Sequence, residues 1–359
     1  MAGQQLAISD IEQALADFSD PETGRSVTRM EQVSGIQLDG TSLRLTLGLT
    51  THSAPLWSET VTAAENHLRQ KLPGLTSVEV RRGDHRRPPE KIGEIGLTVK
   101  SVIAVGSGKG GVGKSTIAAA LAYGLRRAGC QVGLMDADVY GPSVPHLVGV
   151  NQRPEVLDGK IQPIEKDGLK VMSMGFLVPP GEAVVWRGPM LHGAITQFLR
   201  DTAWGELDYL VIDMPPGTGD IALTLSQLLP LTGAVVVCTP QELALLDAVK
   251  AIAMFRKVNI PLLGMVENMS GFICPGCGKR YDIFGKGGAE QRAKELNVPF
   301  LGAVPINILV RESGDAGSFD QLFEDPIAGP ALTALSHRLA RQLADSARQT
   351  PPLPRLSIL

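Results

Sequence analysis

Cysteines and aromatic residues are scarce in this chain of 359 residues, which has four cysteines and 4% aromatic side chains. So few cysteines do not form the disulfide framework that is typical of small secreted domains. No apolar run approaches the roughly 20 residues of a membrane helix, and the first residues lack the basic start and long apolar stretch of a signal peptide. We therefore expect a cytoplasmic protein without a membrane partner, whose neighbouring cysteines are reduced and serve metal binding or redox chemistry.

The chain also lacks an excess of charge of either sign, because its net charge is −3 at pH 7. This balance provides no global basic surface, so we expect no nucleic-acid partner. The basic stretch "RRGDHRR" at residues 81–87 is interpreted as a solvated linker. The six histidines are scattered without a paired spacing such as HExxH, and none is assigned a function.

Hydrophobic residues make up 43% of the chain, enough to fill one large and one small core. Residues 1–82 predict a small α+β domain with an opening helix, a hairpin turning at Asp39 and Gly40, a second helix and the strand "TSVEVRR". Residues 83–100 have the composition of a linker. Residues 101–342 alternate apolar strands with helices, which predicts an α/β domain whose mostly parallel sheet is covered by helices on both faces. We expect a Pro-rich, extended tail at residues 343–359.

A complete phosphate-binding motif, "GSGKGGVGKST", occupies residues 106–116 between a predicted strand and a predicted helix. Its glycines let backbone N–H groups turn toward phosphate oxygens, and Lys114 adds a full positive charge to that of the helix N-terminus. Ser115 holds the position that usually binds Mg²⁺. The sequence therefore predicts a P-loop NTPase site that binds nucleotide phosphates together with Mg²⁺. The predicted nucleotide-binding residues of this loop are Gly108, Lys109, Gly110, Gly111, Val112, Gly113, Lys114, Ser115 and Thr116.

Carboxylates follow two of the predicted strands. Asp213 ends the strand of "LVIDMPPGTGD", and Asp136 and Asp138 end that of "LMDADVYGPS". A carboxylate that bridges to Mg²⁺ is presented from a strand end beside the P-loop, which makes Asp213 the candidate magnesium residue. A helix cap or an ion pair is the alternative role for Asp213. Phosphoryl transfer needs positioning and charge neutralisation, and these residues would supply both together with Lys114.

Two of the four cysteines, Cys274 and Cys277, lie on a Pro/Gly turn in "GFICPGCG". Thiolates suit Zn²⁺ and iron–sulfur clusters, which usually take four ligands, so one chain supplies only half of a site. A symmetric dimer would double the pair. A bridging zinc site and a redox dithiol are the alternatives, although the segment shows no helix such as usually follows a redox motif. Cys130 and Cys238 are expected to be buried and not to bind metal.

The P-loop carries an additional lysine, Lys109, in the pattern KGGxGKS. This pattern resembles the deviant Walker A motif of the family that includes the septum-positioning, partition, arsenite-pump and nitrogenase iron-protein ATPases. The resemblance implies an ATP-dependent homodimer in which Lys109 reaches the partner's nucleotide. It also implies that Asp138 orients the attacking water, that Asp136 supports the metal shell and that Asn268 in "VENMS" reads the adenine. The alternatives are a solvated loop lysine for Lys109, a helix cap or ion pair for Asp136, and a turn-forming residue for Asn268.

Beyond the P-loop, the segments "DADVYGPSVP", "WRGPM", "DMPPGTGD", "VENMSGFICPGCG" and "IFGKGG" resemble the Mrp or ApbC family of iron–sulfur cluster carrier ATPases. The resemblance implies a cluster, expected to be [4Fe–4S], that bridges a homodimer through Cys274 and Cys277. It further implies a slow ATP hydrolase that receives the cluster from an assembly scaffold and transfers it to apo-proteins. Thiolates bind both [2Fe–2S] and [4Fe–4S] clusters, so the residues leave the nuclearity open.

The first 82 residues resemble the small PaaD- or SufT-like domain that is often fused ahead of these ATPases. The resemblance rests on the opening helix, "DPETG", the paired strands and "LPGLTSVEV". Relatives usually carry a Cys-Pro pair after the second strand, but here Ala54 precedes Pro55. A direct ligand role of this domain is therefore in doubt, and partner docking is its alternative role.

Two other functions are compatible with a P-loop ATPase that carries a cysteine pair. The first is a positioning or partition ATPase that acts as a switch on membrane or DNA, although the C-terminal "RQTPPLPRLSIL" supplies no convincing basic amphipathic helix. The second is a zinc-bridged ATPase scaffold. Binding to anionic liposomes or DNA tests the first, and the metal content of the purified protein tests the second.

Overall fold

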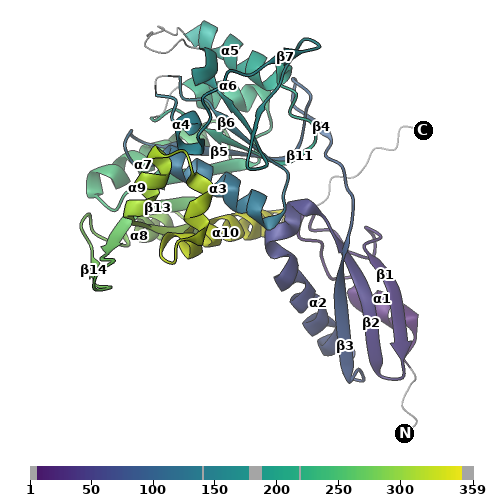
Figure 1. Ribbon diagram of the computed structural model, residues 1–359. Coiled ribbons are helices and arrows are strands. Elements are labelled where there is room, and N and C mark those ends of the chain that lie inside the picture. The colour runs from purple at the N-terminus through teal and green to yellow at the C-terminus, as the bar shows by residue number, and fades with distance from the viewer. Residues whose placement is uncertain (1–5, 140, 178–187, 218–219, 350–359) are drawn as a thin grey trace. The chain divides into compact units, whose positions relative to one another are not determined.

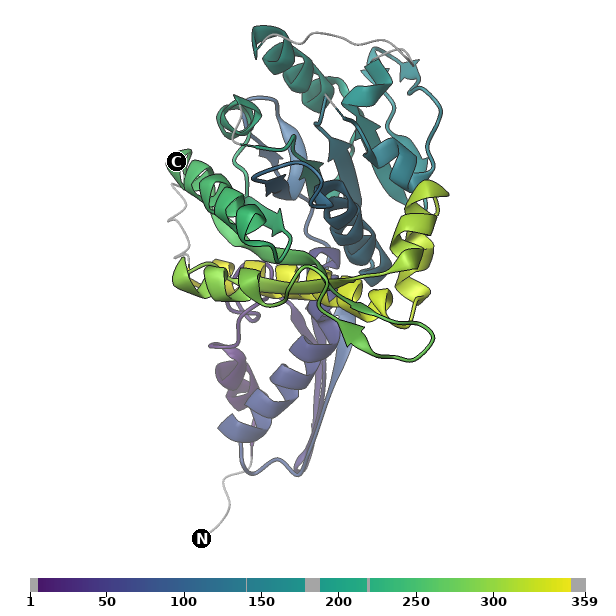
Figure 2. The same ribbon diagram turned by 90° about the vertical axis from the view of Figure 1, so that its left-hand side faces the viewer.

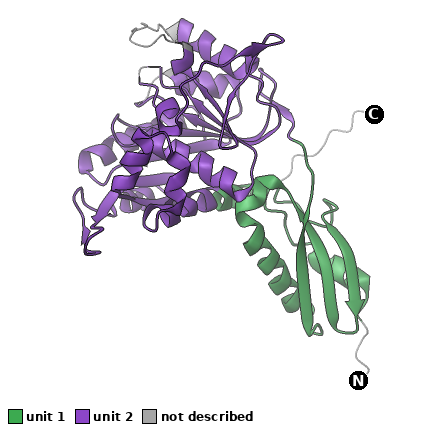
Figure 3. Ribbon diagram, in the orientation of Figure 1, with its two compact units in different colours: residues 1–88, 340–359 green, residues 89–339 purple. Residues whose placement is uncertain are grey.

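The computed structural model describes residues 6–139, 141–177, 188–217 and 220–349. The chain folds into two compact units, unit 1 with residues 1–88 and 340–359 and unit 2 with residues 89–339 (Figure 3). Parts of several segments named above lie outside the described residues, namely Tyr140, residues 186–187 and 218–219, and the end of the tail at 350–359.

Unit 1 is built on a three-stranded sheet. Its elements are α1 (Ile8–Leu15), β1 (Val33–Asp39), β2 (Ser42–Leu49), the 3₁₀ helix η1 (Thr51–Leu56), α2 (Trp57–Lys71) and β3 (Ser77–Asp84). β1 and β2 are antiparallel, and β2 and β3 are parallel. Leu43 and Leu47 of β2 are buried in one core with Ile11 of α1 and Leu68 of α2, because alternate residues of a strand face the same side. The predicted hairpin is confirmed, and Gly40 turns it at a φ of +59°.

The predicted linker is partly folded into unit 1. β3 extends to Asp84, so the basic stretch begins inside a strand. Arg82 places its guanidinium 4.1 Å above the ring of Trp57. Arg87 is ion-paired with the buried carboxylates of Asp20, at 3.5 Å, and Glu22. The interpretation of residues 81–87 as a linker is therefore wrong, because residues 81–84 belong to β3 and Arg87 is paired with buried acids of the "DPETG" segment.

The last helix, α10 (Ala328–Gln349), continues past the predicted domain end at residue 342. Residues 343–349 are therefore helical, where the sequence analysis expects an extended tail. Leu56 of η1 is buried in a cluster with Ala340 and Ala344. These two alanines are four residues apart, so they lie on one face of the helix and admit the leucine. This contact is the physical reason why the end of α10 belongs to unit 1.

Unit 2 alternates strands with helices. Its strands are β4 (Lys91–Ile92), β5 (Leu97–Ser107), β6 (Val132–Asp136), β7 (Val156–Leu157), β8 (Lys160–Ile161), β9 (Ile164–Lys166), β10 (Leu169–Ser173), β11 (Leu207–Asp213), β12 (Gly233–Cys238), β13 (Leu262–Ile273), β14 (Arg280–Tyr281) and β15 (Phe300–Ile306). Its helices, besides the first part of α10, are α3 (Lys114–Ala128), α4 (Val144–Val148), η2 (Met174–Leu177), α5 (Gly188–Asp201), α6 (Asp220–Leu228), α7 (Glu242–Lys257), α8 (Gly288–Glu295), α9 (Ile308–Asp315) and η3 (Phe319–Glu324).

The sheet of unit 2 is mostly parallel, as predicted. Its parallel strands have the order β10-β6-β11-β5-β12-β13-β15, and β4, β9 and β14 pair with them in the antiparallel direction. The carboxyl ends of the parallel strands share one edge of the sheet. β5, β6 and β11 therefore bring the P-loop and the predicted carboxylates to the same edge.

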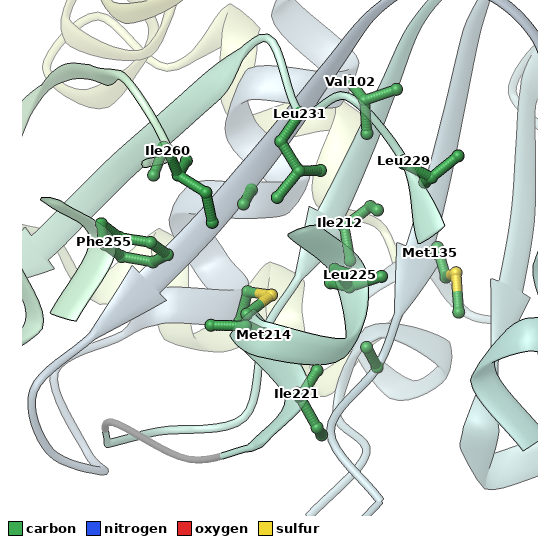
Figure 4. Packing of buried hydrophobic residues seen from close by; sticks show 14 of the residues in the cluster. Val102, Met135, Ile212, Met214, Ile221, Leu225, Leu229, Leu231, Phe255 and Ile260 are labelled. Atoms are coloured by element: carbon green, nitrogen blue, oxygen red, sulfur yellow. The ribbon is translucent and has the colours of Figure 1, made fainter. Parts of the chain in front are cut away.

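Helices cover both faces of this sheet (Figures 1 and 2). On one face, Val102 of β5 packs in a core with Ile212 of β11 and Phe255 of α7 (Figure 4). Ile103 and Val105 alternate with Val102 and are also fully buried, and α3 packs against β5, β6 and β11. β5 is thus apolar on both sides, which is typical of a central parallel strand. No described helix is long and apolar enough to cross a membrane.

Candidate functional site

The P-loop connects β5 to α3 and is shaped by its glycines. Gly111 and Gly113 have φ of +79° and +80°, a region that disfavours side chains. A Cβ on Gly108 would lie 2.0 Å from the carbonyl oxygen of Asp247 in α7, so the loop approaches that helix closely. α3 begins at Lys114, and its first N–H groups suit a phosphate group.

A cavity of about 270 Å³ opens at this loop. It is lined by Ser107, Lys109, Gly110, Gly111, Gly113, Lys114, Ser115, Thr116, Asp138, Gly141, Ser143, Leu147 and Pro216. Most of the predicted nucleotide-binding residues therefore surround one space. Gly108 and Val112 are not among the lining residues; Gly108 packs against α7 and Val112 is buried.

Lys114 lines this cavity, and its amino group lies close to two acidic side chains. Its Nζ lies 2.5 Å from Oδ1 of Asp213 and 4.0 Å from Oδ2 of Asp138. It also donates to the hydroxyl of Ser115 at 3.3 Å. Lys114 is only 6% exposed and Asp213 is fully buried, so the pair sits in a region of low dielectric where electrostatic interactions are strong. The structure thus brings together the residues that the sequence analysis assigns to phosphate and magnesium.

The two carboxylate oxygens of Asp213 differ in their hydrogen bonding. Its Oδ1 binds Lys114, whereas its buried Oδ2 has no hydrogen-bond partner among the described residues. Burial raises the pKa of Asp213, and the charge of Lys114 opposes this effect. An unpartnered buried carboxylate oxygen next to a P-loop serine fits Mg²⁺, which prefers oxygen ligands. Asp213 and Ser115 are the residues present that would hold it.

Asp136 occupies a different environment, although it lies beside Asp213 in the register of β6 and β11. Its Oδ1 accepts from the backbone N–H of Asp138 at 3.0 Å. Its Oδ2 accepts from the N–H of Val144 at 3.1 Å and from the Ser173 hydroxyl at 3.2 Å. Burial and the charge of Asp213 raise its pKa to about 7. Asp136 does not line the cavity but holds the segment that presents Asp138 to it.

Asn268, at the carboxyl end of the sheet in β13, borders a second and more apolar cavity of about 520 Å³. Its side-chain amide donates to the P-loop carbonyl of Val112 at 2.9 Å. Thr116 lines both cavities, so they adjoin. The second cavity is lined by Thr116, His146, Leu147, Asn268, Met269, Ile283, Phe284, Pro305, Ile306, Asn307, Val310, Arg311, Gly314 and Asp315. Apolar walls with a few polar groups suit a nucleoside.

Most residues of this second cavity carry no signal in the sequence. Pro305, Ile306 and Asn307 carry no motif, and only their place after β15 brings them here. Ile283 and Phe284 belong to "IFGKGG", a segment that signals the family but received no role from the sequence. The structure places both side chains in the wall of this cavity.

Cys274 and Cys277 lie on the turn between β13 and β14, a hairpin that projects from the rest of unit 2 (Figures 1 and 2). The N–H of Cys274 donates to the carbonyl of Lys279 at 3.0 Å, and the N–H of Gly278 donates to the carbonyl of Cys274 at 2.8 Å. The N–H groups of Cys277 and Gly276 face the Cys274 sulfur and lower the pKa of its thiol. Cys277 is exposed and Cys274 is half-buried, so both sulfurs are accessible to a metal centre.

Of the four cysteines, all within the described residues, only these two present accessible thiols in one copy of the chain. Cys130 and Cys238 are buried, as predicted, and burial raises the pKa of Cys238 to about 12. Ala54, in η1 of unit 1, supplies no thiol there. Within the described ranges, no group of three or more His, Cys, Asp or Glu side chains is placed to hold a metal ion.

The family profile described as NUBPL iron-transfer P-loop NTPase matches residues 98–340. The chain belongs to this family. A second profile, of iron–sulfur cluster assembly proteins, matches residues 8–81 in unit 1 of this iron-transfer P-loop NTPase. The predicted P-loop NTPase fold and the predicted relationship to cluster carriers are confirmed.

Curated relatives extend over nearly the whole chain. The iron–sulfur cluster carrier protein of Deinococcus radiodurans is 46% identical over 344 residues, which cover 95% of this chain and 96% of that protein. The carrier protein of Synechocystis is 42% identical over 346 residues, 93% and 97% of the two chains. Among solved structures, the nucleotide-binding protein from Archaeoglobus fulgidus in complex with ADP is 42% identical, with a TM-score of 0.57, and covers 64% of this chain and 90% of that one.

Proposed function

We propose that this P-loop NTPase hydrolyses ATP and carries an iron–sulfur cluster on Cys274 and Cys277, which it transfers to apo-proteins. The observation that carries the proposal is the accessible cysteine pair on a projecting hairpin of an iron-transfer P-loop domain. The cluster is the cargo, and an exposed turn lets it be received and released. The relatives named as iron–sulfur cluster carrier proteins support the same function.

ATP would occupy the two adjoining cavities, with its phosphates at the P-loop and its base beside Asn268. The ADP complex of the Archaeoglobus relative supports nucleotide binding. Lys114 would neutralise phosphate charge, and Asp138, which lines the cavity, would orient the attacking water. Ser115 and Asp213 would hold Mg²⁺, which supplies charge neutralisation at the phosphates when it is bound.

A homodimer would complete the cluster site. A thiolate-held cluster takes four ligands, and one chain presents two. A two-fold axis beside the hairpin would bring Cys274 and Cys277 of both copies together, and one [4Fe–4S] cluster would then bridge the dimer. Lys109 lines the P-loop cavity of its own chain. In the dimer we propose that it also reaches the nucleotide of the partner subunit.

The test is anaerobic reconstitution with iron and sulfide, followed by measurement of iron, sulfide and zinc per dimer. We expect about four irons and four sulfides per dimer, lost in Cys274→Ala/Cys277→Ala. The matched control is Cys130→Ala/Cys238→Ala, which removes two buried thiols and should keep the cluster. Zinc without sulfide, or iron that survives loss of the exposed pair, would contradict the carrier function.

A further inference from the structure

One segment of unit 2 connects the cysteine pair with the second cavity, the one beside Asn268, which we call the nucleoside cavity. We call residues 270–287 the cysteine loop; it begins just after Asn268 and Met269, which line the second cavity. It then forms the hairpin with Cys274 and Cys277 and returns to the same cavity with Ile283 and Phe284. Both stems of the cysteine loop therefore lie at the wall of the nucleoside cavity.

The base of the cysteine loop is closed by one buried carboxylate. Glu267, which is 1% exposed, accepts from the hydroxyl of Ser270 at 2.6 Å. It also accepts from the N–H of Gly287 at 3.0 Å and from the N–H of Ala289 at 2.8 Å. Because one carboxylate binds both ends of the loop, residues 270–287 are held as a unit at their base. A displacement of either stem is therefore transmitted to the hairpin that carries the cysteines.

The entering stem contains an irregular backbone. Met269 has a φ of +58°, in a region that non-glycine residues rarely adopt. The pairing of β13 with β15 shifts register between Asn268 and Phe272, and Gly271 has a φ of +74°. This irregularity lies between the residue that contacts the P-loop and the hairpin. Strained backbone of this kind gathers at ligand clamps and switch regions.

The returning stem leaves apolar side chains uncovered at the cavity. Ile283 is 59% exposed and Phe284 is 37% exposed, although both line the second cavity. An aromatic base in this cavity would cover them and gain apolar contact. Tyr281, in the same loop, is 45% exposed but is not among the lining residues. Of the two exposed aromatic side chains of the cysteine loop, Phe284 thus lines the second cavity and Tyr281 does not.

We propose that Phe284, together with Ile283, is the contact through which a bound adenine nucleotide fixes the position of Cys274 and Cys277. The inference rests on the proposed function in one respect, that the nucleotide binds beside Asn268. Phe284 and Ile283 are positioning residues, because they act on the cysteines through the loop. A nucleotide that prefers the fixed loop must, by linkage, change the population of that state.

The test is hydrogen–deuterium exchange of the cluster-free full-length protein with and without saturating Mg-ADP. We expect ADP to slow exchange of the amides within residues 270–287 by about five-fold or more in the wild type. In Phe284→Ala at saturating ADP, the slowing should fall below about two-fold. The matched control Tyr281→Ala removes an aromatic side chain of the same loop that is also exposed but does not line the cavity, and it should keep the full response.

Two independent measurements, calorimetry and hydrogen exchange, distinguish failure of this inference from failure of the proposed function. Calorimetry reports ADP binding independently of exchange. If ADP binds but exchange of residues 270–287 does not change, or if Phe284→Ala responds like the wild type, the role of Phe284 is wrong and nucleotide binding stands. If ADP does not bind at all, the proposed function itself fails. Should Phe284→Ala not fold, Ile283→Ala, at a more exposed position in the same wall, takes its place with the same expected loss.

Discussion

Asp136 and Asp213 lie in register at the ends of neighbouring strands. They have different roles because their hydrogen bonds differ. Asp136 has both oxygens occupied by three donors of its own surroundings. Asp213 has one oxygen on Lys114 and one that is buried without a partner in the described structure. A buried carboxylate oxygen without a hydrogen-bond partner is destabilising, and binding of a cation to that oxygen offsets this penalty. Position in the sheet is equal for the two residues, but only Asp213 is available to a ligand.

At the residue scale, we expect Asp213→Asn to lower the rate of ATP hydrolysis by roughly 100-fold. The amide cannot balance the charge of Lys114 or bind Mg²⁺ as an anion. Steady-state phosphate release at saturating Mg-ATP measures the effect.

Asp208→Asn is the matched control, since Asp208 lies at the other end of β11. Asp208 forms a buried ion pair with Lys100 at 3.0 Å. Its loss should lower the free energy of unfolding by about 3 kcal/mol and leave the rate of hydrolysis of the folded enzyme unchanged. Equal rates for Asp213→Asn and the wild type would exclude Asp213 from the hydrolysis site.

At the scale of elements, the P-loop depends on a close approach to α7. Gly108 has the backbone of Asp247 against it, whereas a Cβ on Gly110 would meet nothing within 4 Å. Gly110 is also absent from the positions with positive φ. Gly108 therefore has no room for a side chain, whereas Gly110, two residues later in the same motif, has room for one.

We expect Gly108→Ala to lower the free energy of unfolding by about 1–3 kcal/mol, because the added methyl group would lie 2.0 Å from a backbone oxygen. It should also weaken ADP binding, since the loop must move away from α7. Gly110→Ala should leave the unfolding free energy unchanged. Chemical denaturation and calorimetry measure the two effects, and equal stability of the two variants would contradict the packing described here.

At the scale of the whole molecule, α10 contributes to both units. Its first part belongs to unit 2, and from Ala340 onward it belongs to unit 1. Within unit 1, Arg341 is ion-paired with Glu59 of α2. Leu56 is 3% exposed in its cluster with Ala340 and Ala344. A segment more than 250 residues away in the chain thus forms a small apolar cluster of unit 1 with Leu56, separate from the core around Leu43 and Ile11.

We expect Ala344→Asp to destabilise unit 1 by about 3 kcal/mol, because it buries a charge beside Leu56. Hydrogen exchange of α2 and η1 should accelerate, while amides of β11 in unit 2 keep their protection. Asp345→Ala changes the exposed neighbour and serves as the control. Unchanged exchange in α2 and η1 would show that the end of α10 does not support unit 1.

Features that depend on a local pattern of residues can be predicted without the structure. The complete P-loop motif, the apolar strands of the parallel sheet, the Asp39–Gly40 hairpin and the Cys274–Cys277 turn are read from neighbouring residues. Local conformation follows from side-chain and glycine chemistry over a few positions, so these predictions agree with the structure.

Contacts between residues far apart in the chain could not be predicted and are known only from the folded structure. Arg87 is ion-paired with Asp20 and Glu22, and the end of α10 belongs to unit 1. The folded structure also gives Ile283 and Phe284 a common cavity with Asn268. No periodicity or short motif records these contacts, because burial and hydrogen bonding between remote segments depend on how the chain folds as a whole.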